Sequence, residues 1–378
     1  MKINQFQPYV GQEEYESIKE CFDTNWITEG PKAKEFSVKL CKLIGCKYGV
    51  FAPNGTLSLY LGLKAIGIGL GDEVIVPDFT FIASANAVEM VGATPIFADI
   101  NRDTLHIDLE KCTDLITENT KAIMPVHIYG TAVNMDSLME FAGLHKLRVI
   151  EDAAQAIGVT WDGKHCGSFG DVSSFSFFAD KTITTGEGGF VCTNDKEIFT
   201  KLLYLRNQGR IDRGSFIHPE IGYNFRMTDI QCAIGLTQLN KLDDIIQKKQ
   251  NILQTYKTLL KDVDGLEIME PEELSNHIPF RVAIKFDRKI KGIMKYLSSK
   301  DIETRTFFYP LHKQPCYDAP ILKDSTYVYN HGLCMPSYPE LQTDQIEYVC
   351  KHICKALDVD EVEAFLIDND LNPYIQTR

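Results

Sequence analysis

A lysine that follows an apolar run is the residue in this sequence whose type and position most favour chemistry. Lys181 lies within SFSFFADKTITTGEGGF (residues 174–190), after a strand-like run and before a polar, glycine-rich stretch. Glycine lets backbone approach a ligand closely at such a place. A lysine whose pKa is lowered by its surroundings forms Schiff bases with carbonyl compounds. An ordinary exposed lysine at a strand end has the same local pattern, so spacing alone leaves both interpretations open.

A carboxylate stands at the end of a second buried run. VIEDAAQAIG (residues 149–158) ends its apolar part at Glu151 and Asp152 and continues into small residues that predict a helix. Ligands of parallel sheets bind beyond the carboxyl ends of the strands, so we expect Asp152 to face that crevice. There it suits a cationic ring nitrogen, a metal or a ribose hydroxyl. The alternative is that Asp152 caps the helix that follows.

Two segments suggest how a phosphate or a flat ligand is held. PNGTLSLYLGL (residues 53–63) places Asn54, Gly55 and Thr56 before a helical apolar period, and a helix N-terminus binds phosphate. Plain N-capping is the alternative. VPDFTFIASANAV (residues 76–88) puts Phe79 and Phe81 after a strand, where they either stack on a flat cofactor or fill the core.

A third polar segment precedes another helix. IGYNFRMTDIQCAIGLTQL (residues 221–239) places Asn224 and Arg226 in a loop before a helix that Thr228 or Asp229 would cap. An ordinary polar loop is the alternative here.

The elements that position these residues follow from the apolar pattern. Strand-like runs are 73–77, 94–99, 121–129, 147–152, 172–178 and 189–193. Several are apolar along their whole length, which is typical of parallel strands covered by helices on both faces. Helical patterns such as 55–66 and 135–146 lie between them. The alternation predicts an α/β fold with a mainly parallel sheet.

A long helix and a second unit follow. Apolar positions recur from Leu242 to Leu260 at steps of three, four or seven, which predicts one amphipathic helix leaving the large domain. Beyond it, RVAIKF (residues 281–286) reads as a strand and 343–357 as a helix. We therefore predict a large α/β domain over 1–240, including the N-terminal segment. Residues 241–378 should form the linking helix and a small α+β domain, with a poorly ordered polar tail at 368–378.

Composition excludes several classes of protein. The 378 residues carry a net charge of −13, which disfavours a general nucleic-acid binder. We find no apolar stretch of membrane-span length and no signal-peptide core at the N-terminus. The eleven cysteines contain no C-x-x-C and the nine histidines no H-x-x-x-H. These patterns argue against a disulfide framework and a zinc site, and favour a reducing cytoplasm without metal, membrane or nucleic-acid partners.

Taken together and in order, seven segments resemble the DegT-type sugar aminotransferases over roughly residues 5–350. The segments are NGT, VPDFTFIASANAV, GATPIFADI, KAIMPVHIYG, VIEDAAQAIG, GSFGDVSSFSFFADKTITTGEGG and IGYNFRMTDIQCAIGLTQL. That family consists of pyridoxal-phosphate (PLP) enzymes of the aspartate aminotransferase fold, PLP fold type I. The resemblance implies a large domain with a mainly parallel seven-stranded sheet, a smaller C-terminal α+β domain, and a homodimer with the active site at the subunit boundary. TNWIT, SFFADKTITTGEGG and FYPLHKQP are most similar to the perosamine synthases, which aminate carbon 4 of GDP-4-keto-6-deoxymannose.

The resemblance also implies roles for individual residues. Lys181 would hold PLP covalently and then move a proton, and Asp152 would keep the pyridine nitrogen protonated so that the ring accepts electrons. The other implied contacts are Gly55, Thr56 and Ser176 with the phosphate, Phe81 with the ring face, Gln155 near the ring hydroxyl, Asn224 with the phosphate of the partner subunit, and Tyr309 and His312 with substrate.

Two residues depart from the family pattern. Gln155 stands where perosamine synthases often carry an acidic residue, and FFADK replaces the more usual FFGNK beside Lys181. A related branch of dehydratases has histidine in place of the lysine, so Lys181 favours transamination. The expected reaction transfers the amine of glutamate to a keto sugar nucleotide in surface polysaccharide biosynthesis. The alternatives are a smaller phosphorylated ketone as acceptor, or a non-catalytic relative that keeps the fold for binding or regulation.

Overall fold

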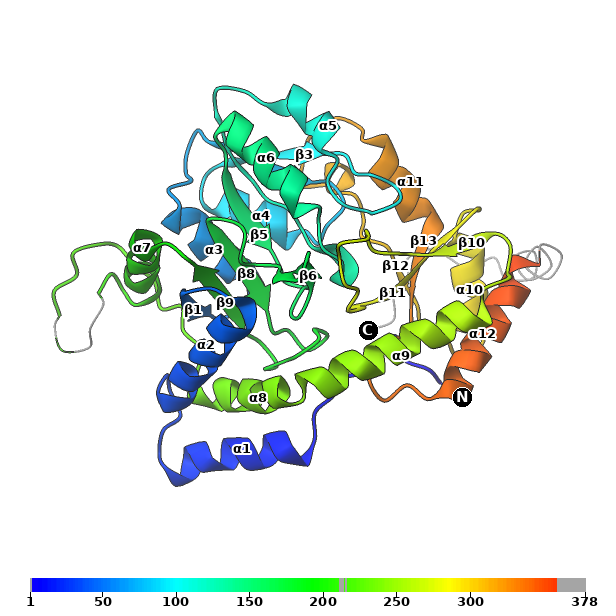
Figure 1. Cartoon of the computed structure of the whole chain (residues 1–378), viewed down its shortest axis with the longest axis horizontal. Helices are drawn as coiled ribbons and strands as arrows, with labels where there is room; N and C mark the ends of the chain where they lie inside the picture. The colour runs from blue at the N-terminus through cyan, green and yellow to red at the C-terminus, as the bar shows by residue number, and fades with distance from the viewer. Residues whose placement is uncertain (1, 211–213, 215, 359–378) are drawn as a thin grey trace.

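The computed structural model describes residues 2–210, 214 and 216–358, so the predicted tail at 368–378 lies outside the described residues. Its centre is a seven-stranded sheet of order β1-β9-β8-β5-β4-β2-β3 (Figure 1). The strands are β1 (Tyr48–Ala52), β2 (Glu73–Pro77), β3 (Thr94–Ala98), β4 (Thr120–Ile123), β5 (Arg148–Asp152), β8 (Val172–Ser176) and β9 (Gly189–Thr193). Strands β3, β2, β4, β5 and β8 pair in parallel, whereas β9 is antiparallel to both of its neighbours. The predicted α/β fold with a mainly parallel sheet is confirmed.

Helices cover both faces of this sheet. They are α2 (Pro31–Ile44), α3 (Gly55–Ala65), α4 (Ala83–Met90), α5 (Leu109–Cys112), α6 (Met135–His145), α7 (Lys196–Arg206) and α8 (Asp229–Asn240), with α1 (Gln12–Asp23) packed outside α8 (Figure 1). In β2, Ile75 belongs to the apolar cluster that includes α2, α6 and α8 side chains, while Val74 and Val76 belong to the cluster with α3, α4 and α7. Burial on both faces explains why the strand is apolar along its length.

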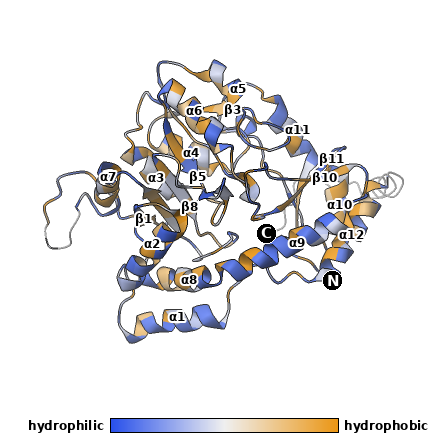
Figure 2. Ribbon diagram, in the orientation of Figure 1, coloured by the Kyte–Doolittle hydropathy of each residue, from blue (hydrophilic) through white to orange (hydrophobic). Residues whose placement is uncertain are grey.

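A smaller unit holds a four-stranded antiparallel sheet of order β10-β11-β13-β12. Its elements are β10 (Leu266–Ile268), β11 (Val282–Phe286), β12 (Arg305–Thr306), β13 (Gly332–Met335), α10 (Lys291–Ser299), α11 (Lys323–His331) and α12 (Thr343–Leu357). Helix α9 (Leu242–Leu259) links the two units, and hydrophilic and hydrophobic residues alternate along it (Figure 2). Its buried face includes one charged residue, Lys249. A short hairpin of β6 (Thr160–Trp161) and β7 (Lys164–His165) completes the strands.

Three features differ from the sequence prediction. The chain start packs with the small unit, because Ile3 pairs with Ile302 and is buried in the same apolar cluster. Strand β4 ends at Ile123, and its predicted continuation keeps only one bridge, at Val126, before a turn at Ile128–Gly130. The small residues 153–158 form turns and no helix, and Gly158 there has a positive φ of 82°. In the described part of the chain, each helix is too short or too polar to cross a bilayer.

Candidate active site

The loop between β8 and β9 carries Lys181, and its amine has no polar partner. The side chain is partly buried, and within the described residues its Nζ has neither a hydrogen bond nor an ion pair. Nζ lies 4.6 Å from the centroid of the Phe280 ring. Burial lowers the pKa of Lys181; Asp180 and Asp152 oppose this effect, and Arg281 adds to it. A lysine amine with a lowered pKa is a better nucleophile towards a carbonyl carbon.

The buried carboxylate of Asp152 ends β5, on the side of the sheet edge where Lys181 lies. Its Oδ2 accepts a hydrogen bond of 2.7 Å from Ser84 Oγ, and its Oδ1 accepts one of 3.1 Å from the backbone N–H of Ala154. Two donors from different elements fix the carboxylate's orientation. Its negative charge opposes the lowering of the Lys181 pKa that burial causes. The two groups can therefore serve one ligand, the amine by bonding it and the carboxylate by stabilising a cation on it.

The N-terminus of α3 meets the end of β8. Asn54 caps the helix by accepting a 3.0 Å hydrogen bond from Leu57 N–H, so the N–H groups of Gly55 and Thr56 have no partner within the helix. A Cβ on Gly55 would lie 2.8 Å from Ser176 Cβ, which shows how closely the two elements approach. Backbone N–H groups, a helix dipole and a serine hydroxyl here make a cradle for a phosphate.

The two predicted aromatics have different environments. Phe79 is 1% exposed and packs against Tyr129, Phe307 and Phe308, so it is a core residue. Phe81 is 58% exposed, and its ring centroid lies 6.3 Å from that of Phe308. An aromatic that is open on one side suits stacking on a flat ring, as predicted for Phe81.

Gln155 is buried and holds a strained turn. Its Oε1 accepts a 2.8 Å hydrogen bond from the backbone N–H of Tyr129, a residue with a positive φ of 52°. This contact leaves the amide nitrogen of Gln155 to donate elsewhere. Gln155 stands in a turn and not in the helix predicted after Asp152, because residues 153–158 are turns.

Tyr309 and His312 were predicted to contact substrate, and only the side chain of Tyr309 is exposed. Tyr309 is exposed and packs edge-on against Tyr329. His312 is buried; its backbone N–H and its Nδ1 both lie 2.7 Å from the oxygens of Asp78. The expectation that His312 faces substrate therefore disagrees with the structure, since its ring anchors the loop to the large domain. Sequence analysis missed Asp78, whose signal is a carboxylate directly after β2.

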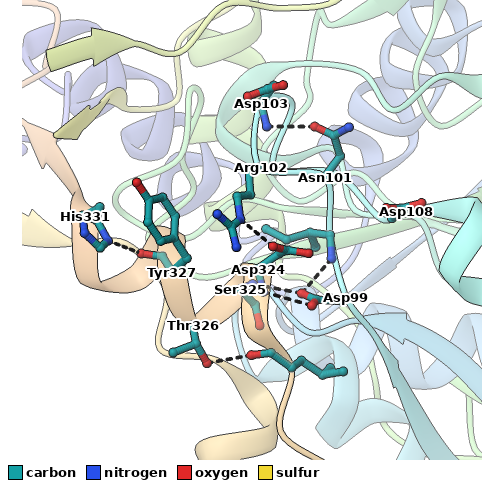
Figure 3. A network of polar contacts seen from close by, with 12 residues as sticks. Asp99, Asn101, Arg102, Asp103, Asp108, Asp324, Ser325, Thr326, Tyr327 and His331 are labelled. Carbon is teal, nitrogen blue, oxygen red and sulfur yellow. Dashed lines mark hydrogen bonds and ion pairs between the residues drawn. The ribbon is translucent and has the colours of Figure 1, made fainter. Parts of the chain in front are cut away.

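A second carboxylate, Asp99 after β3, holds the neighbouring helix α11 (Figure 3). Its oxygens accept hydrogen bonds from the backbone N–H groups of Asp324 at 3.0 Å and Ser325 at 2.9 Å, so it caps the helix. Asp324 in turn pairs with Arg102 and Lys111. Asp78 and Asp99 together tie the segment that carries Tyr309 to the edge of the parallel sheet.

Asn224 lies exposed beside α7 and α3. It forms an isolated backbone bridge with Asn207, and its Oδ1 accepts a 2.9 Å hydrogen bond from Arg226 Nε. The hydroxyl of the adjacent Tyr223 accepts a 2.6 Å hydrogen bond from the hydroxyl of Tyr60 of α3. The assignment of Asn224 to the phosphate of a partner subunit concerns a second chain and stays a prediction.

The residues present fit PLP. This cofactor requires four groups, and the structure has a candidate for each. They are the Lys181 amine without a polar partner, the buried Asp152 carboxylate whose charge acts on that amine, the exposed ring of Phe81 and the N-terminus of α3. No cluster of three or more potential metal ligands occurs among residues 2–210, 214 and 216–358.

Comparisons with known proteins agree with this geometry. Residues 8–354 match the model of the DegT/DnrJ/EryC1/StrS aminotransferase family. GDP-perosamine synthase of Escherichia coli O157:H7 is 39% identical over 92% of this chain and 96% of its own length. The putative pyridoxal phosphate-dependent aminotransferase EpsN of Bacillus subtilis is 31% identical over 91% and 93%. The aminotransferase PseC of Helicobacter pylori, involved in pseudoaminic acid biosynthesis, superposes with a TM-score of 0.90 at 28% identity, over 95% of this chain and all of its own. This chain therefore belongs to the DegT/DnrJ/EryC1/StrS aminotransferase family of sugar aminotransferases, whose cofactor is PLP.

Proposed function

We propose that this aminotransferase moves the amine of glutamate to a ketone on a nucleotide-linked sugar of the 4-keto-6-deoxy type, in surface polysaccharide biosynthesis. The observation that carries the proposal is the Lys181 amine, which has no polar partner and lies within the field of the buried Asp152 carboxylate. The identity to GDP-perosamine synthases supports a sugar of this type.

The residues divide the work by their chemistry. When bound, PLP supplies an electrophilic carbon and a ring that accepts electrons. The Lys181 amine holds the cofactor and, once released, carries the proton at the carbon that gains or loses nitrogen. Asp152 keeps the ring nitrogen protonated, because a carboxylate beside a cationic nitrogen favours its charged form.

Other side chains bind and orient. Gly55, Thr56 and Ser176 hold the phosphate, Phe81 covers one ring face, and the free amide of Gln155 donates near the ring hydroxyl. The exposed Tyr309 contacts substrate. Asn224 completes the phosphate site of a partner subunit, which makes the working unit a homodimer; we place it in the cytoplasm.

The experiment is a screen of acceptors with glutamate, read by mass spectrometry of the products. One arm holds 4-keto and 3-keto sugar nucleotides, and the other holds nucleotide-free phosphorylated ketones. We expect an amino sugar nucleotide, with 2-oxoglutarate formed in equal amount, and no product from the Lys181→Ala variant. If product forms only in the nucleotide-free arm, the acceptor is a smaller phosphorylated ketone and not a sugar nucleotide. A purified protein that stays colourless with PLP would point to a non-catalytic binding or regulatory protein.

A further inference from the structure

The residue before Lys181 is a carboxylate shared by two arginines of the small unit. Asp180 Oδ2 accepts a hydrogen bond from a terminal guanidinium nitrogen of Arg281 and lies 3.9 Å from a terminal nitrogen of Arg305. The two contacts are unequal. The side chains of Asp180 and Arg281 are 11% and 5% exposed, whereas that of Arg305 is 48% exposed. Arg281 is thus the buried partner of Asp180, and Arg305 stands at the open side of the pair.

Arg281 makes further contacts within the protein. It also donates to the side chain of Gln5, and its guanidinium carbon lies 4.5 Å from the centroid of the Phe280 ring. The Lys181 amine contacts this same ring at 4.6 Å, so Arg281 and the reactive amine share one aromatic ring, and Arg305 is connected to them through Asp180. Arg305 contacts the ring of Phe6 at 5.0 Å.

Two guanidinium groups share the single carboxylate of Asp180. The buried Lys249 of α9 lies 3.2 Å from the carbonyl oxygen of Pro279. The groups that act on Lys181 electrostatically are Asp180, Asp152 and Arg281. Arg305 is half-exposed and shares Asp180, the residue before the reactive lysine, with Arg281, so its guanidinium keeps charge and donors for an anion.

The chemistry of the donor identifies that anion. An α-amino acid must place its amine where the Lys181 amine lies, and its carboxylate is bonded to the same carbon as that amine. A planar guanidinium close by binds a carboxylate through two parallel hydrogen bonds. The diphosphate of a sugar nucleotide is separated from carbon 4 by the sugar ring, so it reaches farther from the reactive amine.

We propose that Arg305 binds the carboxylate of the amino donor, and that Asp180, held by Arg281, positions the Arg305 guanidinium beside Lys181. The inference rests on the proposed function and deepens it by assigning the donor site. It also gives a role to the aspartate in FFADK, which departs from the family pattern next to the lysine.

The test separates the two halves of the reaction with the PLP-loaded enzyme. In the first half, glutamate is added alone and the loss of the cofactor's visible band is followed in a single turnover. In the second half, enzyme already carrying the amine is mixed with the keto sugar nucleotide. Loss of a hydrogen-bonded charge pair should raise the half-saturating glutamate concentration of Arg305→Met by about 10- to 100-fold and leave the second half unchanged. Arg305→Lys should lie between, because it keeps the charge and loses the planar fork.

A matched control and a binding measurement complete the design. Arg288→Met removes another arginine of the small unit, one that pairs with Asp287, and should leave both halves unchanged. Glutarate, a dicarboxylate without an amine, should bind the wild-type holoenzyme by calorimetry and lose at least tenfold in affinity in Arg305→Met. Asp180→Asn should raise the half-saturating glutamate concentration as well, with Asp180→Glu restoring part of it, whereas a merely structural role would slow both halves.

Two results would contradict the role of Arg305. If Arg305→Met slows the sugar half and leaves glutamate unaffected, the guanidinium serves the diphosphate and the proposal is wrong. Unchanged glutamate and glutarate binding would overturn it as well. Failure of every sugar acceptor would refute the proposed function alone, because the glutamate half-reaction still tests Arg305.

Discussion

Ser84 Oγ donates a 2.7 Å hydrogen bond to Asp152 Oδ2, and this contact ties the end of β5 to the first turn of α4. Thr80 Oγ1 lies 3.1 Å from Ser84 Oγ and is buried. Because the hydroxyl of Ser84 donates its one hydrogen to Asp152, Thr80 is the donor in that second contact. The same short segment therefore orients the Asp152 carboxylate and carries Phe81, so the residues that we propose to meet the ring nitrogen and the ring face are held in fixed relation.

Asp152→Asn should lower the rate of transamination by about 10²- to 10³-fold, since it removes one preorganised charge at the reacting cofactor. Ser84→Ala keeps the charge and loses one hydrogen bond, so it should lower the rate by roughly tenfold. Stopped-flow measurement of the glutamate half-reaction, at equal cofactor occupancy, checks both values. A larger loss in Ser84→Ala than in Asp152→Asn would contradict this order.

Gly55→Val should weaken PLP binding. Its Cβ would lie 2.8 Å from Ser176 Cβ, so the N-terminus of α3 must move away from β8 and the phosphate cradle opens. We expect the dissociation constant of PLP, from titration of the apoprotein, to rise at least about tenfold. Gly143→Ala in α6 is the control, because a Cβ there meets nothing within 4 Å. It should keep the affinity for PLP and stabilise the fold by about 0.5–1 kcal/mol; equal losses in both variants would refute the cradle.

Lys249 should make the free energy of unfolding depend on pH. Burial lowers its pKa from 10.5 to about 7 in the folded protein. The unfolded chain then binds more protons between pH 7 and 10.5, so this residue's contribution to stability rises with pH through that window. Urea unfolding at pH 7 and pH 9.5 should show a smaller increase for Lys249→Met than for wild type.

Lys248→Met serves as the control for that measurement. Lys248 pairs with Asp244 at 2.7 Å, which raises its pKa above the usual value, so its effect lies above the tested window. The Lys248→Met variant should show the same increase in the free energy of unfolding between pH 7 and pH 9.5 as the wild type. The prediction fails if Lys249→Met retains the full rise.

Asn224 and Lys181 should act in the same site from different subunits. Asn224→Ala and Lys181→Ala homodimers should each be nearly inactive. Coexpression of the two variants yields mixed dimers in which one site has both native residues, so the pool should regain about a quarter of the wild-type activity per subunit. Tagged purification of the mixed dimer and its steady-state rate check this. No recovery in the mixed dimer would place both residues in one chain.

Much of the fold and part of the site were predictable. The bounds of β2 and β9 agree with the apolar runs, because burial on two faces demands continuous apolar sequence. The proximity of Lys181 to Asp152 follows from their positions at the ends of parallel strands, which meet at one edge of the sheet. The local pattern did not separate Phe81 from Phe79, since both follow β2. The family resemblance pointed to Phe81, and packing makes Phe79 a core residue.

The sequence by itself determined the alternation of strands and helices, the residue types at the strand ends and the family. Tertiary structure decided which of those side chains are open and which are spent on internal contacts. His312 meets Asp78 across 234 residues, and Arg281 meets Asp180 across 101. Local propensity carries no information about such pairs. Whether an ionic or aromatic side chain faces a ligand or another residue depends on the burial that distant segments impose on it.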